Sequence, residues 1–173
     1  MFNLYEDAKE RYEILNDILK EEGITGIELI VIGGEVGRTL LGESEYRSTL
    51  DIDVISEQDL PLEVIEKLNE AGLEYVGVLE TPPPEDMEEA HTVRFSNLTI
   101  HYPSIEDFAL SKLMTTRGKD DNDLRNYPIL DSCDIDELKC RIKEYRTYTL
   151  NPNNPDYNFA NLDEYLKVRG IKH

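Results

Sequence analysis

The chain has 173 residues, 39% of them hydrophobic, and a formal net charge of −19. This length and apolar content predict one globular domain with a sizeable core. No apolar run is long enough to span a bilayer, and the start of the chain lacks the basic and apolar regions of a signal peptide, so we expect a cytoplasmic protein without a membrane partner. The acidic excess argues against non-specific binding of duplex DNA, and it suits either simple solubility or a basic protein partner.

The first part of the chain predicts a helix, a strand and a second helix. Apolar residues recur at helical spacing over residues 4–22. A β-branched run over residues 27–32 predicts a strand, which ends at Gly33-Gly34. A helix is expected to follow over residues 35–41. The chemically suggestive unit here is therefore strand, glycine turn, helix.

Strand and helix signals continue to alternate until about residue 103, after which helical signals dominate. Apolar and polar residues alternate over residues 48–55, which predicts a strand with Asp51 and Asp53 on one face. Ser96-Asn97 predicts a tight turn within a hairpin. The remaining predicted elements are a helix at 61–71, strands at 73–79, 92–95 and 98–102, and helices at 104–115, 118–127, 134–145 and 162–168.

Together these elements predict an α+β fold, in which a short mixed sheet carries helices packed mainly on one side. We expect residues 1–103 to form the α/β core. Residues 104–146 are expected to form a helical segment that completes the same domain and lines one wall of its cleft. Residues 147–173 are rich in turn-forming residues and are expected to be a peripheral tail.

Two aspartates two positions apart on a strand suit a divalent cation. Their Cβ atoms lie about 6.5–7 Å apart on one face, within reach of a single ion. Mg²⁺ prefers oxygen ligands and is usually held by one or two carboxylates together with nucleotide phosphates and water. Because such a pair also arises by chance, Asp51 and Asp53 alone do not identify the site.

The glycine pair upstream strengthens this hypothesis. Gly33 and Gly34 lack a β-carbon, so phosphate oxygens can approach the main-chain amides there, and the following helix start adds partial positive charge. The alternative is a simple tight turn between strand and helix. The combination of strand, glycine pair and helix with a later Asp-x-Asp strand is more specific than either motif alone.

These motifs resemble the core of the polymerase-β-like nucleotidyltransferase superfamily. The resemblance rests on Ile30-Val31-Ile32-Gly33-Gly34 and on Arg47-Ser48-Thr49-Leu50-Asp51-Ile52-Asp53-Val54. It extends to Ser104-Ile105-Glu106-Asp107, Leu110-Ser111-Lys112-Leu113 and the segment from Arg117 to Leu124, which are similar to small stand-alone members such as minimal nucleotidyltransferases and AbiEii-like toxins.

The resemblance implies a function and a set of roles. The enzyme would use Mg²⁺ or Mn²⁺ to move a nucleoside monophosphate from a nucleoside triphosphate to a hydroxyl on RNA or protein, in a toxin–antitoxin or phage-defence system. Asp51 and Asp53 would hold the metal ion and Lys112 would face the triphosphate. The implied nucleotide-binding residues are Gly33, Gly34, Ser48, Thr49, Arg117 and Lys119.

Some of these residues also have a plainer interpretation. Lys112 is equally compatible with a solvated helix lysine. Arg117 and Lys119 belong to a segment, with Asp120, Asp121 and Asp123, that is either a salt-bridged helix start or a charged cluster beside the triphosphate.

One departure from the superfamily pattern supports a rival function. A third carboxylate usually comes from a later strand, whereas the predicted hairpin offers His91, Arg94, Asn97 and His101. Either histidine is a candidate base in its neutral form, although an ordinary surface position suits both. The rival hypothesis is a catalytically inert member of the fold that acts as a binding partner, such as an antitoxin or a regulatory subunit.

Overall fold

The computed structural model describes residues 2–46, 51–77, 86–146 and 157–172. The chain divides into two compact units. Unit 1 comprises residues 1–78 and 87–104, and unit 2 comprises residues 79–86 and 105–173. The predicted α+β class is confirmed, because a five-stranded mixed sheet and seven α-helices are present in the described part of the chain.

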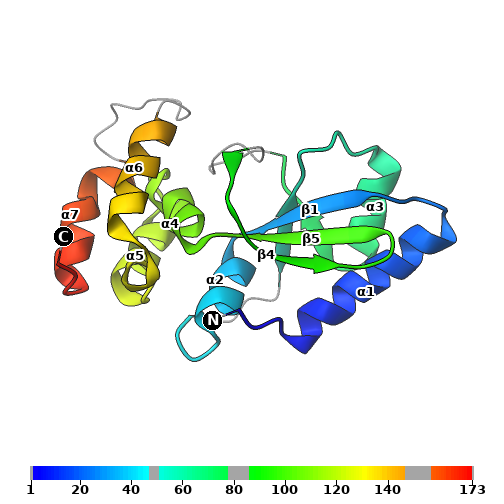
Figure 1. The fold of residues 1–173 in the computed structure, drawn as a ribbon, viewed down its shortest axis with the longest axis horizontal. Helices are drawn as coiled ribbons and strands as arrows, with labels where there is room; N and C mark the ends of the chain where they lie inside the picture. Colours follow the sequence, from blue (N-terminus) through cyan, green and yellow to red (C-terminus); the bar gives the residue numbers. More distant parts are fainter. Residues whose placement is uncertain (1, 47–50, 78–85, 147–156, 173) are drawn as a thin grey trace. The chain divides into compact units, whose positions relative to one another are not determined.

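Unit 1 is built on one sheet with the strand order β3-β2-β1-β5-β4 (Figure 1). The central strand β1 is antiparallel to β2 and parallel to β5. The outer strand β3 is parallel to β2, and the outer strand β4 is antiparallel to β5. The strands are β1 (Ile27–Ile32), β2 (Ile52–Ile55), β3 (Leu73–Tyr75), β4 (Glu89–Arg94) and β5 (Leu98–Pro103).

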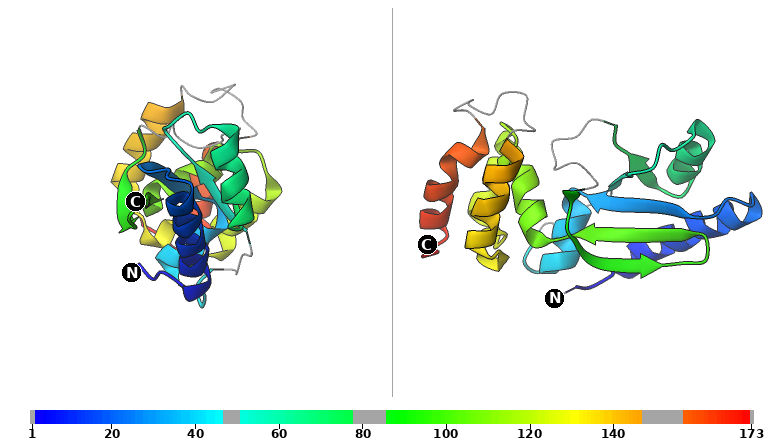
Figure 2. Two further views of the ribbon diagram at one scale, coloured as in Figure 1. Left: turned by 90° about the vertical axis from the view of Figure 1, so that its right-hand side faces the viewer. Right: turned by 45° about the horizontal axis from the view of Figure 1, so that its top comes forward.

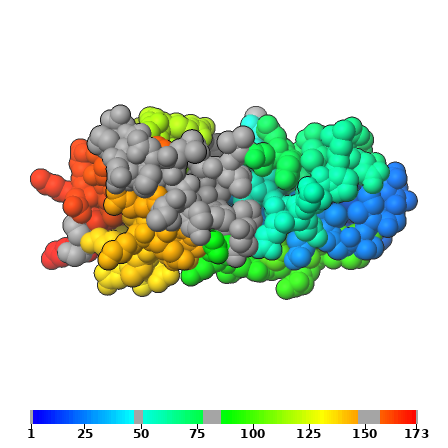
Figure 3. Space-filling model, turned by 90° about the horizontal axis from the view of Figure 1, so that it is seen from above, coloured from blue at the N-terminus to red at the C-terminus, as the bar shows by residue number. Residues whose placement is uncertain are grey.

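One face of this sheet is covered by helices. Leu29, Ile100 and Tyr102 are buried on it, whereas Ile30 and His101 on the opposite face are half-buried. The covering helices are α1 (Glu6–Glu21), α2 (Gly34–Leu41) and α3 (Leu62–Glu70). α1 contacts both β5 and α3, and Figures 2 and 3 show α1 and α3 close together. Buried residues alternate with less buried ones along β1 and along β5 as far as Tyr102, and this alternation gives the sheet its single apolar face.

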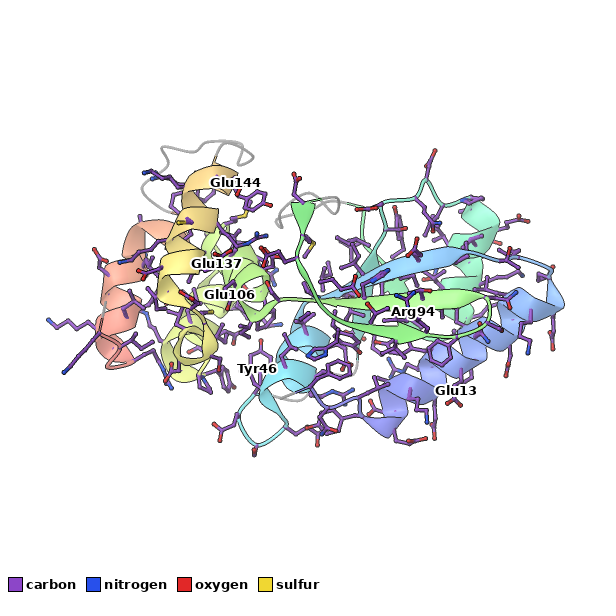
Figure 4. The ribbon with its side chains drawn as sticks, viewed as in Figure 1. Glu13, Tyr46, Arg94, Glu106, Glu137 and Glu144 are labelled. Atoms are coloured by element: carbon purple, nitrogen blue, oxygen red, sulfur yellow. The ribbon has the colours of Figure 1, made fainter. Side chains whose placement is uncertain are left out.

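Unit 2 is helical. Its helices are α4 (Ile105–Leu113), α5 (Gly118–Asn126), α6 (Ile135–Tyr145) and α7 (Leu162–Val168), with short 3₁₀ turns at Leu130–Ser132 and Asn158–Asn161. Asp134 caps α6, because its carboxylate accepts the backbone N–H of Glu137 at 3.1 Å. Figure 4 labels Glu137 and Glu144 on this helix.

The last described segment belongs to the core of unit 2. Residues 157–172 fall within the stretch that the sequence predicts to be a peripheral tail, yet Phe159, Leu162 and Leu166 are buried there. Tyr165 is also buried, and its hydroxyl donates to the Asp121 carboxylate at 2.6 Å. This hydrogen bond joins α7 to α5.

Predicted and observed element boundaries agree closely, with differences at three strands. β3 ends at Tyr75 rather than at residue 79, and β4 begins at Glu89 rather than at residue 92. β2 begins at Ile52, so Asp51 directly precedes the strand instead of lying within it. Strand length depends on which neighbour is available for pairing, and the sequence of one strand does not show this.

The two cysteines are free thiols in different surroundings. Cys140 is exposed on α6. Cys133 is half-buried, and its Sγ lies 3.3 Å from the carbonyl oxygen of Ile129 and 3.7 Å from that of Ile105. Burial, together with the nearby negative charges of Glu106, Asp131 and Asp134, raises the pKa of the Cys133 thiol.

Candidate nucleotidyltransferase site

A glycine turn and an aspartate meet at one end of the sheet in unit 1. Gly33 follows the last residue of β1 and adopts φ +73° and ψ −150° as the N-terminal cap of α2. Ile32 and Asp53 are directly opposite each other in the β1–β2 pair. A β-carbon built on Gly33 would lie 3.5 Å from Asp53 Oδ2. The predicted association of the glycine turn with this aspartate is therefore present in the geometry of unit 1.

Asp51 immediately precedes β2, the strand that carries Asp53. Asp51 is exposed and Asp53 is half-buried, so both are partly open to water. Among the described residues, no group of three or more His, Cys, Asp or Glu side chains is arranged to hold a metal ion. A Mg²⁺ or Mn²⁺ ion that takes its remaining ligands from water and nucleotide phosphates needs one or two protein carboxylates, and Asp51 with Asp53 fits this requirement.

The start of α2 supplies complementary charge beside Asp53. The first amides of a helix point along its axis and carry partial positive charge. In α2 the third of them, at Val36, donates to the Gly33 carbonyl at 3.1 Å. Gly33 and Gly34 leave the approach to these amides free of β-carbons. Anions such as phosphate groups bind well at a helix start of this kind.

The strand β5 does not place a carboxylate next to Asp53. The parallel register sets Ile30 opposite His101, and the six residues of β5 include no aspartate or glutamate. His101 instead bridges two glutamates, with Nε2 3.0 Å from Glu28 and Nδ1 3.1 Å from Glu89.

The second predicted histidine base is also engaged. His91 stacks on Phe2 with ring centroids 4.2 Å apart. Its role as a base stays a prediction, as does that of His101.

Lys112 lies in unit 2, where it is buried among carboxylates. Its ammonium is 2.9 Å from Asp123 and 3.4 Å from Asp120, and the lysine is 5% exposed. Thr115 donates to the second oxygen of Asp120 at 2.7 Å. The interpretation of Lys112 as a solvated lysine does not hold, while its predicted contact with a triphosphate stays a prediction.

Of the other four predicted nucleotide-binding residues, two are exposed and two lie outside the described part of the chain. Arg117 and Lys119 are exposed at the start of α5, with the Arg117 guanidinium 3.8 Å from Asp120. Ser48 and Thr49 lie outside the described residues. The predicted roles of all four stay predictions.

Sequence reasoning missed one polar residue beside the glycine turn. Glu35, the second residue of α2, is fully buried and bonded to Arg38, Thr39 and Tyr102. The available signal was a glutamate between Gly34 and Val36 in a short apolar helix, with an arginine three positions later.

Residues 11–169 match a family model described as a nucleotidyltransferase of unknown function (DUF6036). The chain belongs to this nucleotidyltransferase family. Neither a search of curated proteins nor a search of solved structures gives a match. The predicted membership of a small nucleotidyltransferase group is thus confirmed, and the match covers both units of the nucleotidyltransferase.

No helix in the described parts of this nucleotidyltransferase is both long and apolar enough to cross a membrane.

Proposed function

We propose that this nucleotidyltransferase transfers a nucleoside monophosphate from a nucleoside triphosphate to a hydroxyl on RNA or protein, with Mg²⁺ or Mn²⁺ held by Asp51 and Asp53. The observation that carries the proposal is the placement of Asp53 beside the Gly33 turn, with 3.5 Å between Oδ2 and the β-carbon position. Family membership supports the reaction class.

The proposed chemistry follows from this placement. Amides at the start of α2 bind phosphate oxygens and hold the triphosphate with its α-phosphate near Asp53. A divalent cation bound there supplies positive charge against the phosphates and the leaving pyrophosphate. The acceptor oxygen attacks the α-phosphorus in line, the bond from that phosphorus to the bridging oxygen breaks, and the acceptor proton passes to a base or to water.

The biological setting belongs to the same proposal. The segment from Ser104 to Leu124 resembles small stand-alone members that include toxins of defence systems, and a toxin–antitoxin or phage-defence role is consistent with it. The strong acidity favours a basic protein as the partner in such a system.

A transfer assay with labelled nucleotides tests the reaction. Each nucleoside triphosphate, labelled on the α-phosphate, is incubated with Mg²⁺ or Mn²⁺ and with total RNA or cell protein as acceptor. We expect label on one acceptor class with the wild type and none with the Asp51→Ala/Asp53→Ala variant. Asp59→Asn, at an exposed aspartate of the same unit, is the matched control and is expected to transfer label normally.

The position of the label separates this reaction from its competitors. Transfer from γ-labelled nucleotide would identify phosphoryl transfer and contradict the proposal. Nucleotide binding without transfer to any acceptor would favour the inert binding partner. The specific observation for that rival is that β5 carries no carboxylate.

A further inference from the structure

A buried carboxylate lies directly behind the glycine turn. Glu35 is 0% exposed and uses both of its oxygens. Oε1 accepts hydrogen bonds from the Arg38 guanidinium at 2.6 and 2.8 Å. Oε2 accepts from Thr39 Oγ1 at 3.0 Å and from the Tyr102 hydroxyl at 2.8 Å.

These contacts differ in what they connect. Arg38 and Thr39 belong to the same helix as Glu35, so their bonds only shape α2 itself. Tyr102 lies on β5, and its hydroxyl is also 2.6 Å from that of Tyr12 on α1. The Tyr102 hydrogen bond is therefore a polar link from the start of α2 to the sheet, and Tyr12 extends it to a second helix.

The direction of the hydrogen bonds follows from the chemistry. Burial, the neighbouring Tyr12 and the Glu35 charge raise the pKa of Tyr102, and burial with the Glu35 charge raises the pKa of Tyr12. Both hydroxyls therefore keep their protons at neutral pH. Since the single Tyr102 proton is donated to Glu35, Tyr12 donates to the Tyr102 oxygen.

A second link runs from the same helix to α1. The guanidinium of Arg38 donates to both carboxylate oxygens of Asp7 at 3.0 and 3.1 Å. Arg38 is thus held between Glu35 on its own helix and Asp7 on α1.

The location of this network matters because glycines cannot orient the turn by themselves. Gly33 and Gly34 have no side chains to pack, and glycine permits many backbone conformations. A buried charged network is in general no more stabilising than apolar packing of the same volume. We therefore look for its role in fixing the position of α2. The residue that anchors α2 to β5 is separated from Gly33 by only one residue.

We propose that Tyr12, Tyr102 and Glu35 form a positioning chain that fixes the first turn of α2 against the sheet, so that its amides are oriented toward the phosphates of a nucleotide beside Asp53. The inference rests on the proposed function for the identity of the ligand. None of the three residues touches the nucleotide, so each is a positioning residue.

The direct test is Tyr102→Phe, which removes the link to β5 and leaves the contacts within α2. We expect the KM for the nucleotide to rise about threefold to tenfold, with kcat little changed. This rise corresponds to a part of the free energy that a hydrogen bond to a charged group contributes. Hydrogen exchange at the amides of residues 34–36 is expected to become faster. Tyr145→Phe is the matched control, because it removes a buried hydroxyl in unit 2 that donates to the Asp86 carbonyl at 2.7 Å.

A second variant keeps the test decisive if one protein folds poorly. Glu35→Gln keeps the shape and removes the charge, and it should shift KM and hydrogen exchange in the same direction as Tyr102→Phe. Wild-type KM and exchange in both variants would overturn the inference. A different result is that the wild type binds no nucleotide while hydrogen exchange is still faster in both variants. That result would overturn the proposed function and the nucleotide part of the inference.

Discussion

Gly33 is the residue whose backbone conformation most restricts substitution near the candidate site. Its φ of +73° with ψ of −150° lies in a region that side chains with a β-carbon rarely adopt. Asp53 Oδ2 is at ordinary contact distance from the place where a β-carbon would be. Backbone strain, more than steric overlap, is therefore the reason for glycine here.

Gly33→Ala should destabilise the protein and weaken nucleotide binding. The strained conformation predicts a loss of about 1–3 kcal/mol in the free energy of unfolding, measured by urea denaturation. Gly77→Ala is the control, because Gly77 is exposed, has no positive φ and has open space at its β-carbon position. Equal stability of the two variants would show that the Gly33 turn tolerates a side chain.

At the scale of elements, a buried ion cluster joins α4 to α5. Lys112 on α4 contacts Asp120 and Asp123 on α5, and all three are buried. Asn158, the first residue of the 3₁₀ turn before α7, donates to the Lys112 carbonyl at 3.0 Å and links that turn to α4. Removing the ammonium would take away the cation that the two buried carboxylates share, in a poorly hydrated environment.

Lys112→Met should therefore destabilise unit 2 strongly. We expect a loss of about 3–5 kcal/mol in the free energy of unfolding, and a partial recovery in Lys112→Met/Asp123→Asn. Nucleotide affinity measured on the double variant, once it is folded, then tests the predicted triphosphate contact separately from stability. A single variant as stable as the wild type would contradict the structural role of the ammonium.

The sequence predicts where helices and strands lie better than it predicts which of them pack together. Periodicity and glycine positions locate the helices and β1 closely, because amphipathic patterns are local. The association of Gly33 with Asp53 also follows from a motif. The burial of Lys112 and Glu35 does not, because it depends on α5 folding against α4 and on β5 pairing with β1 rather than on local pattern.

At the scale of the whole molecule, the formal net charge of −19 is the dominant electrostatic feature. Much of it lies on exposed surfaces such as α1, where Figure 4 shows Glu13 projecting from the helix. Like charges of this density repel one another and oppose the compact state. This self-repulsion is sensitive to dissolved salt.

Sodium chloride should accordingly stabilise the protein. Raising the ionic strength from about 0.01 to about 0.1 M shortens the Debye length from about 30 to about 10 Å. If the free energy of unfolding increases by about 1 kcal/mol, the Tm of a chain of this size rises by about 2–4 °C, which calorimetry can measure. Glu10→Gln/Asp17→Asn, with two exposed charges fewer, should show a smaller rise. A Tm that falls with added chloride would mean that attractive ion pairs outweigh the repulsion.

The different surroundings of the two thiols have a practical consequence. Cys140 is exposed, whereas the raised pKa of Cys133 keeps that sulfur in its unreactive protonated form. A maleimide fluorophore added to the native protein will thus attach to one known position on α6. The wild-type chain can carry a single optical reporter without any residue being replaced.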